Sequence, residues 1–221
     1  SDTAVNALMD QALALARAER ARYVEVRSGA LAALDARADL TRNNLYSRWV
    51  VPLERDTQAM WKRVKTSPQQ RVKKARKDGV VVRVAESLAD VDAYYHLHLL
   101  TRSRKHGMPA QPARYFHDLW ETFGAADPAT GQMRLLLAEH AGAVIGGMIL
   151  LISGVTVRNA YSASDPNLWR LGPNNALMWE AISWAGEQGY ARFDMGRTAH
   201  DNPSLASFKH SWGALEEPMP Y

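Results

Sequence analysis

The stretch of residues 133–162 most constrains the fold of this chain, because it holds three apolar segments in close succession. Each segment is rich in the β-branched and aliphatic residues that favour strands. The predicted strands are 133–139, 144–152 and 155–162. Only short turns at 140–142 and 153–154 separate them, and connections of this length join antiparallel neighbours. The sequence therefore predicts an antiparallel sheet that contains these three strands.

Helices are expected on both sides of this stretch along the chain. Apolar residues at helical spacing, together with Pro and Gly signals at helix ends, predict helices at 2–20, 56–66, 68–77, 89–105, 112–123, 173–188 and 204–212. Further strands are predicted at 23–26, 46–53, 80–85 and 190–195, and 80–85 is expected to be buried. This order of elements predicts an α+β fold, with helices packed on a mixed, mainly antiparallel sheet.

Composition excludes several classes of protein. The 221 residues are 47% hydrophobic and 23% charged, which is typical of a globular chain of one or two domains. There is no cysteine, which excludes disulfides, zinc–thiolate sites and a cysteine nucleophile. The longest strongly apolar run, 143–152, is too short to cross a bilayer, and no signal segment opens the chain. We therefore expect a cytoplasmic protein without a transmembrane segment.

Several familiar catalytic and cofactor motifs are missing from the sequence. It has no Gly-rich nucleotide-binding loop, no serine-nucleophile elbow and no His-Glu-x-x-His pair. His96 and His98 lie two residues apart on a predicted helix, so they point to different faces. We expect no metal site.

Positive charge is concentrated in one central segment. Residues 41–79 hold eleven Lys and Arg against three Asp and Glu, whereas the segments on either side are slightly acidic. Eight of these cations follow one another without an acid: Lys62, Arg63, Lys65, Arg71, Lys73, Lys74, Arg76 and Lys77. Such a cluster attracts the phosphates of nucleic acid, anionic lipid or a nucleotide-linked substrate. The alternative is a solvated helix face that meets no partner.

The start of the helix at 173–188 is one candidate binding element. Residues 170–175 open this helix, and the unpaired N–H groups expected there, together with the helix dipole, suit a pyrophosphate. Pro173 removes one of these donors, and an ordinary helix start explains the pattern equally well.

Two motifs near the C-terminal end also carry candidate chemistry. Asp194, Gly196 and Arg197 follow a predicted strand, and they suit either a site at the edge of the sheet or a structural ion pair in a turn. Phe208 and Lys209 place a cation beside an aromatic side chain. Such a lysine can stabilise negative charge on a carbonyl oxygen, or it can be an ordinary solvated side chain.

These motifs belong to a longer resemblance to the Fem family, the FemAB-like peptidyltransferases that add amino acids to peptidoglycan precursors in cell-wall synthesis and include methicillin-resistance-like proteins. The residues that carry it are Asn175–Ala185, Gly189–Tyr190, Phe193–Thr198, Leu205, Phe208–Lys209 and Trp212–Gly213, with further fits at 71–79, 99–107, Tyr115–Phe116 and 161–165. The match extends over about residues 42–221.

The resemblance implies a fold of two GNAT-like acyltransferase domains in tandem. By this comparison residues 80–221 form the second domain, and the order of elements from residue 80 is close to that of a GNAT-type domain. Residues 1–79 would then be the C-terminal remnant of the first domain with basic connecting helices. The N-terminal part of that first domain is expected to be missing from this chain.

The resemblance also implies substrates and site residues. In the family the donor is aminoacyl-tRNA, the acceptor is an amine on a precursor stem peptide, and no bound cofactor is expected. The implied catalytic and substrate-binding residues are Phe208, Lys209, Tyr161, Tyr115, Arg104 and Arg197, with tRNA or phosphate contacts at Lys73, Lys74, Arg76 and Lys77. Gln111 stands where the family's precursor-binding enzyme has an arginine, which leaves another amine open as the acceptor.

The expected reaction is attack of an amine on an activated acyl carbon. It needs a base for the amine proton and donors for the oxyanion. We expect Lys209 and a backbone N–H near Tyr161 to be the donors, and Asp194 to be the candidate base unless it pairs with Arg197. Two alternatives are an acyl-CoA-dependent N-acetyltransferase and a non-enzymatic fold that binds RNA or a partner. The basic cluster would hold tRNA, or the inner face of a membrane that carries a lipid-linked precursor.

Overall fold

The computed structural model describes residues 1–26, 32–102, 109–124 and 131–219. Its strands are β1 (Tyr46–Pro52), β2 (Val81–Val84), β3 (Met133–His140), β4 (Ala143–Ser153), β5 (Thr156–Ser164), β6 (Arg192–Ala199) and β7 (Leu215–Met219). Its helices are α1 (Asp2–Ala18), α2 (Ala32–Asp35), α3 (Thr57–Arg63), α4 (Thr66–Lys77), α5 (Leu88–Thr101), α6 (Ala113–Phe123), the 3₁₀ helix η2 (Pro166–Leu171), α7 (Pro173–Glu187) and α8 (Pro203–Ser211).

The described strands form one seven-stranded sheet in the order β2-β3-β4-β5-β6-β1-β7. The three strands predicted at 133–162 are β3, β4 and β5, and they pair antiparallel through two tight turns as expected. Only β5 and β6 run parallel, and the crossover between them contains η2 and α7. The predicted α+β fold with a mainly antiparallel sheet is therefore confirmed.

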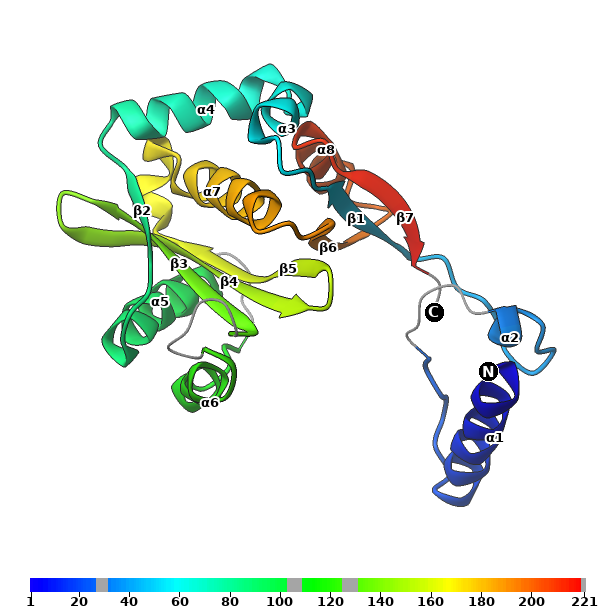
Figure 1. The fold of residues 1–221 in the computed structure, drawn as a ribbon. Helices are drawn as coiled ribbons and strands as arrows, with labels where there is room; N and C mark the ends of the chain where they lie inside the picture. Colours follow the sequence, from blue (N-terminus) through cyan, green and yellow to red (C-terminus); the bar gives the residue numbers. More distant parts are fainter. Residues whose placement is uncertain (27–31, 103–108, 125–130, 220–221) are drawn as a thin grey trace.

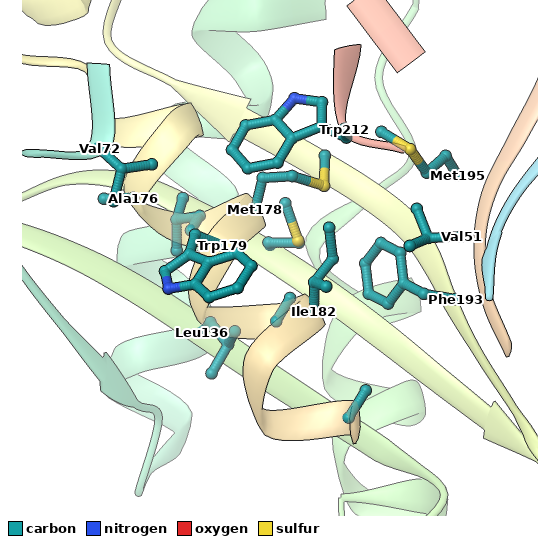
Figure 2. Packing of buried hydrophobic residues seen from close by; sticks show 14 of the residues in the cluster. Val51, Val72, Leu136, Ala176, Met178, Trp179, Ile182, Phe193, Met195 and Trp212 are labelled. Carbon is teal, nitrogen blue, oxygen red and sulfur yellow. The ribbon is translucent and has the colours of Figure 1, made fainter. Parts of the chain in front are cut away.

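Helices cover both faces of the sheet (Figure 1). On one face lies α7, with α3 and α4 packed against its outer side. Met178, Trp179 and Ile182 of α7 fill the layer between Leu136 of the sheet and Val72 of α4 (Figure 2). Because α7 is enclosed by the sheet and by α4, apolar residues occur on most of its surface and not along a single stripe.

The opposite face is covered by α5 and α6 (Figure 1). A second buried cluster joins Tyr94 of α5 and Phe116 of α6 to Leu135 and Ile149 of the sheet. Here α5 approaches the sheet closely over Gly147. A Cβ at this position would lie 2.6 Å from the ring of Tyr94, which is closer than packed atoms allow.

Three expectations about strands need correction. Residues 23–26 are not a strand, and Tyr23 is 77% exposed, because alternation of residue types without a neighbouring strand does not make a sheet. The strand predicted as buried at 80–85 is β2, which pairs only with β3 at the edge of the sheet, so Val81 is 62% exposed. Strand β7 was not predicted, since Glu216, Glu217 and Pro218 are unfavourable in a strand; the edge position tolerates them.

The segment 1–79 divides into two structurally different parts. Strand β1 lies between β6 and β7, and Trp49, Val51 and Met60 belong to the same buried cluster as α7. Residues 46–79 therefore share the sheet and the first of the two core clusters with the described residues of 80–219. That residues 1–79 descend from a first domain stays a prediction.

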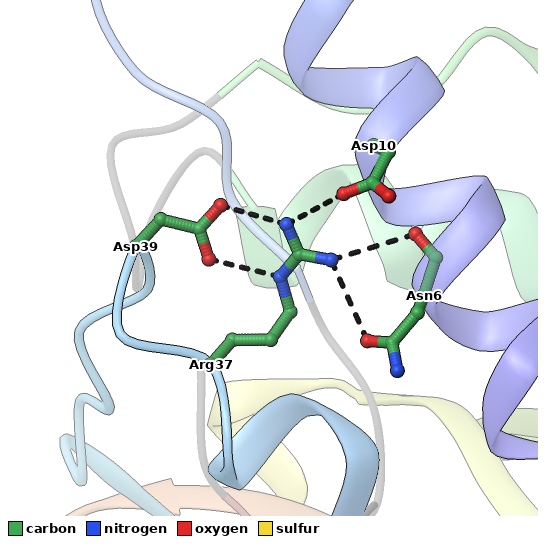
Figure 3. A network of polar contacts seen from close by, with 4 residues as sticks. All are labelled: Asn6, Asp10, Arg37 and Asp39. Carbon is green, nitrogen blue, oxygen red and sulfur yellow. Dashed lines mark hydrogen bonds and ion pairs between the residues drawn. The ribbon is translucent and has the colours of Figure 1, made fainter.

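The N-terminal helices α1 and α2 lie beyond the end of the β1–β7 pair (Figure 1). Arg37 ties α1 to the segment that follows α2. Its guanidinium donates to Asp10 at 2.7 Å and to both carboxylate oxygens of Asp39, and it also contacts Asn6 (Figure 3). Neither α1 nor α2 contributes a residue to the two described core clusters.

Candidate active site

The candidate site lies where the parallel strands β5 and β6 separate. They are paired only from Thr156 opposite Arg192 to Arg158 opposite Asp194. Beyond this point β6 continues along β1, while β5 stays beside β4 and carries a bulge between Asn159 and Tyr161. The diverging ends of the two strands hold residues that the sequence singled out.

Lys209 of α8 is buried at the end of β6 and is 4% exposed. Its ammonium donates to the backbone carbonyl oxygens of Gly196 at 2.8 Å and Arg197 at 2.9 Å. Burial lowers the pKa of Lys209 to about 8, and the carboxylate of Asp194 acts in the opposite direction. Lys209 is therefore protonated in most molecules at neutral pH, so a cation is held inside the protein at this point.

Asp194 acts electrostatically on this lysine, and Phe208 precedes it on α8. Asp194 is 7% exposed, and its Oδ1 accepts a hydrogen bond of 2.7 Å from the backbone N–H of Gly196. The ring of Phe208 meets Trp212 edge to face with 6.3 Å between centroids, and Phe208 remains 38% exposed. The site thus combines a buried cation, a buried carboxylate and an accessible aromatic surface.

Arg197 points elsewhere. Its guanidinium carbon lies 4.5 Å from the centroid of the Tyr46 ring, on the neighbouring strand β1. Gly196, between Asp194 and Arg197, has a φ of +78°, which glycine adopts easily. This backbone turn presents the two carbonyl oxygens that Lys209 binds.

Tyr115 and Tyr161 form a second group, on the α6 side of the sheet. Their hydroxyl oxygens lie 2.8 Å apart, and their rings are nearly perpendicular. Burial and the hydrogen bond with Tyr115 raise the pKa of Tyr161 to about 12, so the Tyr161 hydroxyl is neutral at physiological pH. The pair offers a donor and an acceptor to a polar substrate group, since Tyr115 is 37% exposed.

A buried histidine supports this tyrosine pair. His98 of α5 is 4% exposed, and its Nε2 lies 2.9 Å from Oε1 of Gln111. Burial lowers the pKa of His98, so the ring is neutral and Nε2 donates to the amide oxygen. Its ring also meets Phe116 and Tyr161 edge to face. Gln111, which the sequence marked as a departure from the Fem pattern, therefore fixes the junction between α5 and α6.

The start of α7 lies next to the basic helix α4. Gly172 takes a left-handed conformation with a φ of +72°, and a Cβ there would lie 3.4 Å from the carbonyl oxygen of Arg71. The side chain of Asn174 donates to Ser164 Oγ at 3.0 Å, which fixes the first turn of α7 against the end of β5. In this turn the N–H groups of Asn175 and Ala176 already donate to the carbonyl oxygen of Gly172, both at 3.1 Å.

The eight cations of the basic cluster are all exposed on α3, on α4 and between the two helices. In the part of the chain that the structure describes, Arg63 pairs with Glu54 and Lys74 pairs with Asp78. Val72 and Ala75 anchor α4 to the core, so its basic residues face outward. This basic surface includes Lys73, Lys74, Arg76 and Lys77.

The structure thus assembles two of the predicted groups. It brings Lys209, Phe208 and Asp194 to the end of β6, and it brings Tyr115 to Tyr161. Among the described contacts, none joins the first group to the second. Arg104 lies outside the described residues. Sequence reasoning missed His98 as a supporting residue, because its partner Gln111 becomes visible only when α5 and α6 pack together.

This fold is that of an acyltransferase. A family model described as an acetyltransferase (GNAT) domain matches residues 62–209, which is most of the chain. The chain therefore belongs to the GNAT acetyltransferase family.

Solved structures share the fold of this chain. FemX is similar over 100% of this chain and 77% of its own, with a TM-score of 0.75 and 16% identity. The C-terminal domain of a putative lysylphosphatidylglycerol synthetase from Agrobacterium fabrum has a TM-score of 0.62 at 14% identity, over 86% of this chain and 63% of that chain. L-PGS from Bacillus licheniformis has a TM-score of 0.56 at 14% identity, over 81% and 60%.

Two further findings complete the comparison. A search of curated proteins found no match in sequence. No helix in the described residues is long and apolar enough to cross a membrane.

Proposed function

We propose that this acyltransferase moves an aminoacyl group from aminoacyl-tRNA to an amine of a peptidoglycan precursor or a similar acceptor. The observation that carries the proposal is the buried ammonium of Lys209 between the carbonyl oxygens of Gly196 and Arg197. This lysine follows Phe208, as in the Phe-Lys pair of the Fem family. The similarity of the fold to FemX over the whole chain supports the same proposal.

In this reaction the acceptor amine attacks the ester carbon of the donor. A C–N bond forms, the C–O bond to the tRNA breaks, and the proton lost by the amine is balanced by a proton gained by the departing hydroxyl. An ammonium has three N–H donors, and Lys209 uses two of them on backbone carbonyls. The third is available for the carbonyl oxygen that becomes negative in the intermediate. Asp194 is the proposed base for the amine.

The basic surface is the proposed contact for the phosphates of the tRNA. A protein that binds several phosphates releases counterions, so its affinity falls steeply as salt increases. The same surface would also suit an anionic membrane, and a titration with anionic vesicles distinguishes this outcome from tRNA binding. A cytoplasmic location, where charged tRNA is present, is part of the proposal.

Binding of charged tRNA tests this contact. Lys73, Lys74, Arg76 and Lys77 are replaced together by Gln, and a matched control replaces Arg17, Arg20, Arg22 and Arg42. Each set removes four positive charges and, among the described residues, contains one member of a surface ion pair, Lys74 with Asp78 and Arg42 with Asp35. We expect a loss of affinity of at least about tenfold, and a weaker salt dependence, only in the first set. Equal affinity in both sets would contradict the tRNA contact.

The tyrosine pair is the proposed contact for the acceptor. The hydroxyls of Tyr115 and Tyr161 sit near the end of β5 and remain partly accessible. The side-chain oxygen of Gln111 is hydrogen-bonded to His98, and its amide carries no charge. Gln111 therefore does not supply the charged contact that an arginine at this position would give to a nucleotide-linked acceptor. This arrangement favours an acceptor that presents a polar uncharged group at this point, and it leaves the identity of the amine to experiment.

Acyl transfer from acyl-CoA is the second candidate function. The separation of β5 from β6 and the positive end of the α7 helix dipole favour it, since a helix N-terminus suits the pyrophosphate of such a donor. Titration of acetyl-CoA against the full chain distinguishes the candidates. Micromolar binding of acetyl-CoA without tRNA binding would select this second function.

A further inference from the structure

A cavity of about 360 Å³ lies at the edge of the sheet where β2 ends, and none of the candidate active-site residues lines it. Much of its wall is apolar and includes Trp120 of α6, Met133 of β3, Ile152 of β4 and Trp184 of α7. Its volume falls within the range of small-molecule sites. Its charged lining residues, within the described parts of the chain, are Arg134 and Glu86.

Arg134 is the feature that points to a ligand. Its guanidinium carbon lies 4.4 Å from the centroid of the Trp184 ring. Its Nε is buried, and no described residue accepts a hydrogen bond from it. Burial lowers the pKa of Arg134, while Glu180 and Tyr190 act in the opposite direction. A guanidinium nevertheless keeps its charge in proteins, so the wall of the cavity carries a cation.

The surroundings of Arg134 select the class of ligand. A carboxylate matches the fork of a guanidinium and satisfies its donors. The indole rings of Trp120 and Trp184 suit a flat apolar body. Glu86, exposed at the same cavity, adds negative charge and disfavours a dianion such as phosphate.

We propose that this cavity binds a monocarboxylate with a flat apolar body, with its carboxylate on Arg134 and its body against Trp120 and Trp184. This site is separate from the acyl-transfer site and does not depend on the proposed donor or acceptor.

Matched probes test the proposal on the full chain. We would titrate 3-phenylpropionate and its neutral amide, 3-phenylpropionamide, and follow binding by calorimetry and by the fluorescence of the cavity tryptophans. The carboxylate of the acid forms charge-assisted hydrogen bonds with Arg134, and the neutral amide does not. We therefore expect the acid to bind at least about tenfold more tightly than the amide. Arg134→Gln should abolish this preference, whereas Arg17→Gln, which removes the same charge from α1, should preserve it.

Three results would overturn the proposal: equal binding of acid and amide by the unmodified chain, an unchanged preference in Arg134→Gln, or no binding of the acid up to about 10 mM. Circular dichroism of each variant reports whether it folds. If Arg134→Gln does not fold, the difference between acid and amide in the unmodified chain decides the matter alone.

Discussion

Lys209 combines two properties that are unusual in one lysine, deep burial and an ammonium held by two backbone carbonyl oxygens. Replacing it by Met retains much of its length but removes the charge. We expect Lys209→Met to lower kcat/KM for acyl transfer by about 10²- to 10³-fold, because the developing oxyanion loses its cation. Steady-state kinetics measure the loss, and circular dichroism checks the fold. Unchanged transfer by Lys209→Met would show that Lys209 takes no part in the mechanism.

The lowered pKa of Lys209 has consequences for pH dependence. The folded protein releases this proton at a pH of about 8, whereas the unfolded chain retains it up to the ordinary lysine value of 10.5. Between these values the unfolded state binds more protons, so the free energy of unfolding gains a contribution that rises with pH. We expect urea titrations at increasing pH to show this rise in the unmodified protein and not in Lys209→Met. Transfer should fall over the same range, because the cation is lost.

The hydroxyl pair of Tyr115 and Tyr161 permits a separate test of the acceptor site. Removing one hydroxyl leaves the aromatic packing against Phe116 in place. We expect Tyr161→Phe to raise KM for the acceptor by roughly tenfold with little change in kcat, because one polar contact is lost. The donor KM serves as the internal control. A change in the donor KM alone would show that this pair contacts the donor and not the acceptor.

At the scale of elements, the contact of α5 with the sheet depends on Gly147. A methyl group there would meet the ring of Tyr94 at 2.6 Å. We expect Gly147→Ala to destabilise the protein by about 1–3 kcal/mol, because either the helix or the ring must shift. Thermal unfolding measures the effect. Tyr94→Leu in the same chain should recover part of the loss, and simple additivity of the two changes would contradict direct contact.

The sequence predicted those elements whose signal is local. The segments 133–162 and 173–188 carry long apolar patterns with clear turns, and the structure confirms them. The pattern at 23–26 was equally regular but has no neighbouring strand, and β7 was missed because its pairing with β1 is not encoded locally. The motif of Phe208 and Lys209 identified one site group, whereas the cavity at Arg134 depends on packing between β3 and α7 and has no local pattern.

At the scale of the whole molecule, the order of strands in the sheet indicates where the folding unit begins. Since β1 lies between β6 and β7, a chain of residues 80–221 would leave both strands without their common neighbour. We expect residues 45–221 to unfold cooperatively at nearly the temperature of the full chain, because α1 and α2 share neither core cluster. Residues 80–221 should lack a cooperative transition. Cooperative unfolding of 80–221 would show that this segment is a domain by itself.

Transfer by the full chain tests the central claim most directly. The unmodified protein and Lys209→Met are each incubated with a peptidoglycan-precursor stem peptide that has a free amine, and with either aminoacyl-tRNA or acetyl-CoA as donor. Mass spectrometry of the acceptor records the product. The account predicts an aminoacylated acceptor from aminoacyl-tRNA with the unmodified protein, and a loss of this product in Lys209→Met. Acetylation from acetyl-CoA without any aminoacyl product, or equal products from both proteins, would contradict it.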